Sequence, residues 1–92
     1  MDIEKIASKK RSFAAKQVGG DLVLVPVKNN VTEMNEMFTL NEVGAFIWEN
    51  LGEESTRETL SQSMIEEFDI EHDVARTDLD EFLGQLETMM ND

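Results

Sequence analysis

Residues 39–51 read TLNEVGAFIWENL, and this stretch predicts a strand that runs without a linker into a capped helix. Asn41, at the junction, can accept a hydrogen bond from a backbone N–H of the first helical turn, which otherwise has no partner. Apolar residues then recur on one face at helical spacing: Leu40, Val43, Ile47 and Leu51. A direct strand-to-helix junction fixes the angle between sheet and helix, so the stretch indicates a compact α+β domain.

Three strands are predicted upstream of this helix, over residues 12–18, 22–27 and 34–40. Gly19 and Gly20 separate the first two strands, and two glycines permit the positive φ angles of a tight hairpin. Pro26 has no N–H to donate, so it is expected on an edge or at a strand end. Residues 28–32 are expected to form a loop, and the charged residues 1–11 a flexible N-terminal segment.

A second helix is predicted to begin at a capping box, in which the side chains of Ser55 and Glu58 each satisfy the other residue's backbone N–H. Its apolar residues recur every four positions, at Leu60, Met64 and Phe68. An acidic turn over residues 69–73 separates it from the last helix. Three strands followed by three helices, with a short turn between the last two helices, are typical of a winged helix-turn-helix.

The last predicted helix covers about residues 74–90 and has an apolar stripe expected to face the core: Ala75, Leu79, Phe82, Leu86 and Met89. Leu83 and Met90 fall to one side of this stripe, on the flank that also carries Arg76 and Asp80. Since the stripe does not require Leu83 and Met90, they are candidates for contact with a partner.

Charge is distributed unevenly along the chain. Before Asn41 there are six Lys or Arg and five acids, a net charge of +1, whereas from Asn41 onward there are fifteen acids and two arginines, a net charge of −13. Binding to nucleic acid depends on Lys and Arg that neutralise phosphates. A DNA-binding winged helix places such residues on its last helix, which here offers only Arg76 among many acids. The charge therefore excludes DNA binding through the helices.

Catalytic and metal-binding patterns are missing from the sequence. The 92-residue chain is long enough for one domain and contains no Cys, which excludes disulfides, thiolate nucleophiles and thiolate metal sites. Its single histidine, His72, lies in the acidic turn, and one imidazole beside carboxylates is weak evidence for a specific ion. With no glycine-rich phosphate loop and no catalytic triad, we expect no enzyme activity, no cofactor and no metal.

Membrane association is also not expected. No apolar run approaches the roughly 20 residues that cross a bilayer, and the polar N-terminal residues lack the apolar core of a signal peptide. The sequence thus predicts a cytoplasmic protein.

The motifs in this order resemble the pyrroloquinoline quinone biosynthesis protein D (PqqD-like) family. Its most recognisable segment reads roughly Leu-Asn-x-x-Gly-x-x-Ile/Leu-Trp-x-x-Leu, matched here by Leu40, Asn41, Gly44, Ile47, Trp48 and Leu51. Further matches lie at residues 22–27, 56–60 and 67–70, and along the last helix at Ala75, Asp78, Phe82 and Leu86. The resemblance covers about residues 13–90. It implies a single α+β, winged helix-turn-helix-like domain over residues 12–92, with a small three-stranded antiparallel sheet followed by three helices.

Members of this family are non-catalytic domains that recognise leader peptides of ribosomally made, post-translationally modified peptides. They present the precursor to a modifying enzyme, often a radical S-adenosylmethionine enzyme. The resemblance therefore implies a peptide-binding chaperone whose partners are a precursor peptide and such an enzyme. Residues 28–33 depart from the family pattern and the first strand matches poorly, so a product other than pyrroloquinoline quinone is an open alternative.

In the family the leader peptide adds along the third strand and lies in the cleft against the third helix. Main-chain hydrogen bonds at a strand edge hold such a peptide, while side-chain pockets select it. The resemblance thus implies a peptide-binding site made of an edge strand, Met37, Phe38 and Thr39, and a helix wall, Arg76, Leu79, Asp80, Leu83 and Met90. For Phe38 and Leu79 a place in the core is an equal alternative.

Two glycines and the tryptophan have structural interpretations. Trp48 is expected to anchor the first helix against the sheet rather than to bind a partner. Gly44 is expected to let that helix pack closely on a neighbour, whereas Gly84 either permits a close backbone approach or is a tolerated helical glycine.

An alternative function of a different class is an acidic winged-helix adaptor that binds a protein partner through its helical face. A leader-binding protein predicts a footprint on the edge strand, whereas an adaptor predicts a footprint on the helices. The expected oligomeric state is a monomer or a weak dimer, because an exposed edge strand also allows two copies to pair.

Overall fold

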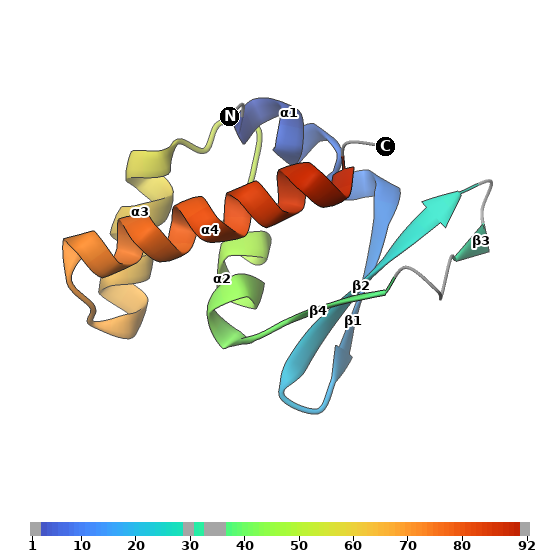
Figure 1. Cartoon of the computed structure of the whole chain (residues 1–92), viewed down its shortest axis with the longest axis horizontal. Helices are drawn as coiled ribbons and strands as arrows, with labels where there is room; N and C mark the ends of the chain where they lie inside the picture. Colours follow the sequence, from blue (N-terminus) through green and yellow to red (C-terminus); the bar gives the residue numbers. More distant parts are fainter. Residues whose placement is uncertain (1–2, 29–30, 33–36, 91–92) are drawn as a thin grey trace.

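A computed structural model describes residues 3–28, 31–32 and 37–90 of the chain. Its elements are α1 (Ile3–Ser8), the short 3-10 helix η1 (Lys10–Ser12), β1 (Phe13–Val18), β2 (Asp21–Lys28), β3 (Val31–Thr32), β4 (Phe38–Leu40), α2 (Glu42–Asn50), α3 (Arg57–Phe68) and α4 (His72–Met90). The helices gather at one end and the sheet extends from them, with α4 running across α3 and α2 in the view (Figure 1). The predicted α+β class, with a small antiparallel sheet followed by three helices, is confirmed; the short strand β3 and the N-terminal helix α1 were not predicted.

The sheet is antiparallel and β2 is its central strand. β1 pairs along one side of β2, and β4 and β3 pair along the other side. The turn between β1 and β2 consists of Gly19 and Gly20, and Gly19 has a φ of 61°, which glycine adopts at low cost. Pro26 lies inside the central strand and pairs with Phe13 of β1, so the expectation of an edge or a strand end was wrong. It falls between the residues of β2 that pair with β4 and those that pair with β3, and neither of these two pairings needs an N–H from Pro26.

The core joins the inner face of the sheet to all four helices. Leu22 and Leu24 of β2 belong to one buried cluster with residues of α1, α2, α3 and α4. The predicted stripe of α4 is buried at Ala75, Leu79, Phe82 and Leu86, while the side chain of Met89 lies outside the described residues. Trp48 is 5% exposed and packs edge-to-face on Phe13 with 6.1 Å between ring centroids. The interpretation of Trp48 as a core anchor is confirmed.

The N-terminal residues differ from the prediction. The sequence indicated a flexible segment outside the core, but Ile6 and Ala7 of α1 are buried in it, and α1 contacts α4. One short pair of apolar residues in a charged segment gives too little periodicity to predict a helix. This helix adds apolar contacts to a small core.

Three boundaries also differ. Val31 and Thr32 were predicted in a loop but pair with the end of β2, since β-branched residues fit a strand ladder. The third strand was predicted over residues 34–40, of which β4 contains 38–40 and residues 34–36 lie outside the described part. Helix α3 is capped one residue later than predicted, by reciprocal bonds between Thr56 and Thr59. Ser55 Oγ instead accepts a hydrogen bond from the N–H of Gly52 at 2.9 Å.

Among the described helices, none is long and apolar enough to cross a membrane.

Candidate functional site

Strand β4 has an edge without a partner strand. It pairs with β2 through Phe38, Thr39 and Leu40, and no strand in the described part of the chain pairs with its other side. Leu40 is buried and Phe38 is half-buried against the core, whereas Thr39 is exposed. The buried side chains hold β4 in place, while the N–H and C=O groups of its open edge can bond with an added strand.

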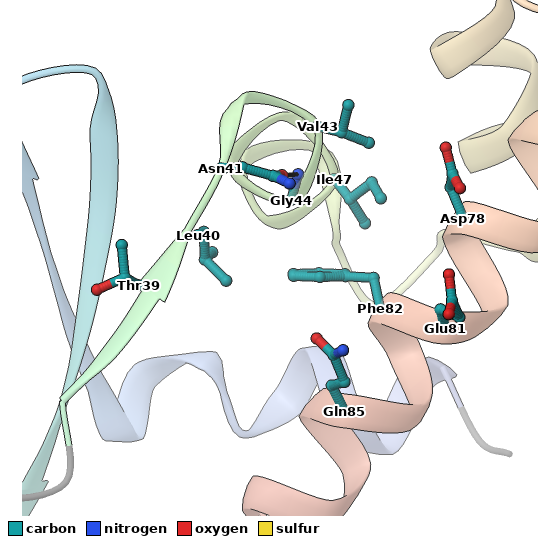
Figure 2. Close-up of a pocket in the computed structure, with 10 residues that line it drawn as sticks. All are labelled: Thr39, Leu40, Asn41, Val43, Gly44, Ile47, Asp78, Glu81, Phe82 and Gln85. Carbon is teal, nitrogen blue, oxygen red and sulfur yellow. Dashed lines mark hydrogen bonds between the residues drawn. The ribbon is translucent and has the colours of Figure 1, made fainter.

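A pocket of about 240 Å³ lies between this strand, the start of α2 and α4 (Figure 2). Its lining is Thr39 and Leu40 from β4, Asn41, Val43, Gly44 and Ile47 from the start of α2, and Asp78, Glu81, Phe82 and Gln85 from α4. A second hollow is lined by Phe38, Glu81, Gly84, Gln85 and Thr88. Glu81 and Gln85 line both hollows, so the two form one depression, the β4–α4 groove.

The end of the groove at α2 is fixed by the junction that the sequence indicated. The side-chain oxygen of Asn41 accepts a hydrogen bond from the N–H of Gly44 at 2.9 Å, which confirms the predicted cap. A Cβ on Gly44 would lie 3.1 Å from Cε1 of Phe82. The ring of Phe82 extends from α4 toward Leu40 and Gly44 (Figure 2). Glycine at position 44 therefore lets α2 approach α4 closely, as predicted, and sets one wall of the groove.

The predicted strand residues lie at or beside the groove. Phe38 and Thr39 line it directly. Met37 precedes β4, is 54% exposed, and lines a hollow on the outer face of the sheet together with Thr39. The structure thus brings these three residues to the open edge of the sheet.

The predicted helix residues whose side chains are described do not line the groove. Leu79 and Leu83 are both 0% exposed and belong to the core, so the expectation that the core does not require Leu83 was wrong. Asp80 accepts two hydrogen bonds from Arg57 of α3, at 2.9 Å and 2.6 Å. Arg76 lines a separate open hollow with residues of α1 and the start of α3. The side chain of Met90 lies outside the described residues.

Sequence reasoning missed the α4 residues that do line the groove. Asp78, Glu81 and Gln85 lie on the flank of the buried stripe opposite to the flank of Asp80. Their spacing places them on one helix face, but the spacing does not indicate that this face lies beside β4. Gly84 has nothing within 4 Å of where a Cβ would stand. No close backbone approach therefore requires a glycine there.

Lys10 is a further residue whose role the sequence did not indicate. Its ammonium donates hydrogen bonds to the backbone carbonyls of Trp48, at 2.6 Å, and Leu51, at 2.9 Å. It also lies 5.2 Å from the centroid of the Trp48 ring, within the range of a cation–π contact. Burial lowers the pKa of Lys10, and the nearby charge of Glu49 partly opposes this. Lys10 thus fastens the N-terminal segment to the end of α2.

The chemistry of the groove is that of a binding surface. His72 is exposed at the start of α4 and does not line the groove. Among the described residues, no group of three or more His, Cys, Asp or Glu is arranged to hold a metal ion. The groove combines an open strand edge, an apolar floor at Phe38 and Phe82, and polar side chains along α4.

Comparison with known proteins assigns the chain to a family. The family model described as coenzyme PQQ synthesis protein D (PqqD) matches residues 21–88, from β2 through most of α4. The chain belongs to the PqqD family. The family resemblance predicted from the sequence is therefore confirmed, and the match includes both walls of the groove.

One solved structure similar to this PqqD family chain is TbiB1 in complex with the TbiA(beta) leader peptide. The two share 22% sequence identity, with a TM-score of 0.65, and the similarity covers 84% of each chain. At this identity the likeness shows a common fold. None of the curated proteins compared with the chain matches it.

Proposed function

We propose that this PqqD family protein binds the leader segment of a precursor peptide in the β4–α4 groove and presents the peptide to a modifying enzyme. The observation that carries the proposal is the open edge of β4 directly beside a groove walled by α4. The leader would pair with the main chain of β4 as an added strand. Its inward side chains would enter the groove and select the sequence.

Two comparisons support this proposal. The family model is that of coenzyme PQQ synthesis protein D, and the family resemblance implies leader-peptide recognition together with a modifying enzyme. TbiB1, which shares the fold, carries a leader peptide in its structure. The alternative of an adaptor that binds through its helical face is not favoured, because both comparisons lead to peptide recognition.

The chemical step belongs to the partner enzyme in this proposal. The groove contains two carboxylates but no His or Lys among its lining residues, and the chain has no Cys. A radical S-adenosylmethionine enzyme is the specific hypothesis for the partner. The proposed compartment is the cytoplasm, where ribosomes make the precursor.

The proposed function is tested by titrating the isotope-labelled full chain with synthetic leaders from short reading frames beside its gene. We expect saturable amide shifts over residues 38–40 and 78–88, with cross-strand contacts between the peptide and β4. Shifts confined to α3 and α1, with β4 unchanged, would support the adaptor alternative and overturn the proposal.

A matched pair of variants separates groove binding from general effects of substitution. Gln85→Trp fills the groove, whereas Gln62→Trp places the same side chain at an exposed position of α3. We expect the first variant to weaken leader binding by about tenfold or more, equivalent to about 1.4 kcal/mol. The second should leave the affinity unchanged. Equal affinities of the two variants would exclude the groove as the binding site.

A further inference from the structure

The β4–α4 groove carries two carboxylates that have no cationic partner in the described part of the chain. Asp78 and Glu81 line the pocket from successive turns of α4. Figure 2 shows both side chains pointing the same way from the helix. The ion pair found on α4 among the described residues belongs to Asp80, on the opposite flank.

Four of the eight Lys and Arg residues of the chain lie away from the groove. Of the two arginines in the acidic helical part, Arg57 binds Asp80 and Arg76 lines the hollow beside α1. Lys10 is bound to the carbonyls at the end of α2. Lys16 lines the hollow on the outer face of the sheet. None of these four side chains is positioned to neutralise the groove.

One feature of the groove opposes its negative charge. The N-terminus of α2 forms part of the lining, and a helix N-terminus carries roughly half a positive elementary charge. Glu42 in the first turn of α2 adds a negative charge at that end. Since two carboxylates outweigh about half a positive charge, the groove stays negative.

We propose that the peptide bound in this groove carries a Lys or Arg on the side of its strand that faces α4. This inference rests on the proposed function and adds the charge class of the peptide to it. Asp78 and Glu81 are three residues apart, about 4.5 Å along a helix axis. Residues on one side of a strand repeat every ~6.7 Å. One cationic side chain can therefore reach both carboxylates, and a guanidinium can bind them with separate N–H groups.

The need for a cationic residue in the leader is tested by fluorescence anisotropy with the full-length chain. The probes are fluorescein-labelled synthetic leaders from the short reading frames beside the gene, and versions in which each Lys or Arg is replaced by Gln. We expect one replacement to weaken binding by about two- to fivefold or more, the effect of losing a partly exposed ion pair. Replacing the other Lys or Arg residues of the leader by Gln should have little effect on the affinity.

The protein side is tested by charge reversal with a matched control. Glu81→Lys reverses a charge in the groove, whereas Glu66→Lys makes the same change at an exposed position of α3. Both variants change the net charge equally, so only a local contact can separate them. We expect Glu81→Lys to weaken binding and a leader with Glu in place of the critical cation to regain affinity for it. Circular dichroism of both variants checks that they fold.

The two proposals fail in different ways. If the leader binds and shifts β4 but all charge variants bind equally, the inference about charge is overturned and leader recognition stands. If no leader binds the folded chain, leader recognition in the groove is overturned and the charge inference with it. Rescue by the charge-swapped leader supports both.

Discussion

The two flanks of α4 are both acidic but use their charges differently. On the flank toward α3, the carboxylate of Asp80 is bound by Arg57 of the same chain. On the flank toward β4, Asp78 and Glu81 line an open groove and have no ion pair within the described residues. The apolar stripe between the flanks is buried. An acidic helix can therefore serve solubility and internal pairing on one flank and leave charge available to a partner on the other.

Leu83 lies in the core between the two flanks of α4 and does not line the groove. Leu83→Ala should lower the free energy of unfolding by about 2–5 kcal/mol, the range for truncating a buried leucine. Urea denaturation followed by circular dichroism measures this, with Glu87→Ala at an exposed position of α4 as the control. A stable Leu83→Ala protein with weakened leader binding would return Leu83 to the peptide site.

The sequence predicted the features that depend on local pattern. The Asn41 cap, the need for glycine at position 44 and the buried stripe of α4 all follow from capping chemistry, side-chain size or helical period. The start of α3 was harder to predict, because Thr56 competes with Ser55 as the cap. Helix α1 was harder to predict because Ile6 and Ala7 form only a short apolar pair.

The helix wall of the groove could not be predicted because it depends on tertiary packing. A period of 3.6 residues shows that Asp78, Glu81 and Gln85 share one flank, and that Arg76 and Asp80 share another. It does not show which of the two flanks will lie beside β4. That is decided by the contact of Phe82 with Gly44, which joins residues far apart in the chain. The edge strand was easier to locate, because the family segment begins directly after it.

Two glycines of the groove should respond in opposite directions to the same substitution. Gly44→Ala places a Cβ 3.1 Å from the ring of Phe82, so we expect a loss of about 1–3 kcal/mol of stability from overpacking. Gly84→Ala meets no atom within 4 Å and replaces a helical glycine, so it should stabilise the protein by about 0.5–1 kcal/mol. Thermal and urea denaturation measure both.

Gly44→Ala also tests whether the end of the groove at α2 contributes to leader binding. Gly44→Ala should weaken leader binding as well, because the added Cβ displaces the ring of Phe82, which lines the groove. If Gly44→Ala were as stable as the original chain, the close approach of the two helices would be contradicted.

A smaller effect should separate the carboxylates of the two flanks. Asp80→Asn removes the partner of Arg57 and should cost about 0.2–1 kcal/mol, since both side chains are more than 40% exposed. A double-mutant cycle with Arg57→Gln isolates the pair energy. Asp78→Asn should cost nothing, because no described cation pairs with Asp78. Equal losses for Asp78→Asn and Asp80→Asn would show that the groove carboxylates are also used for stability.

The smallest effect concerns Lys10, a cation that is satisfied inside the chain and thus contrasts with the carboxylates of the groove. Burial lowers its pKa in the folded chain below the ordinary value of 10.5. Between the lowered pKa and 10.5, the unfolded chain binds more protons than the folded chain, so the free energy of unfolding rises with pH. The chain contains neither Cys nor Tyr, so lysines are the side chains that titrate in this pH range.

Lys10→Met should therefore reduce the increase in the free energy of unfolding with pH in the alkaline range. The substitution also lowers stability at every pH, because the carbonyls of Trp48 and Leu51 lose their donor. Urea denaturation of both proteins across the alkaline range gives the two slopes. Parallel slopes would mean that Lys10 is as hydrated in the folded chain as in the unfolded one, and that the contacts with α2 do not persist in solution.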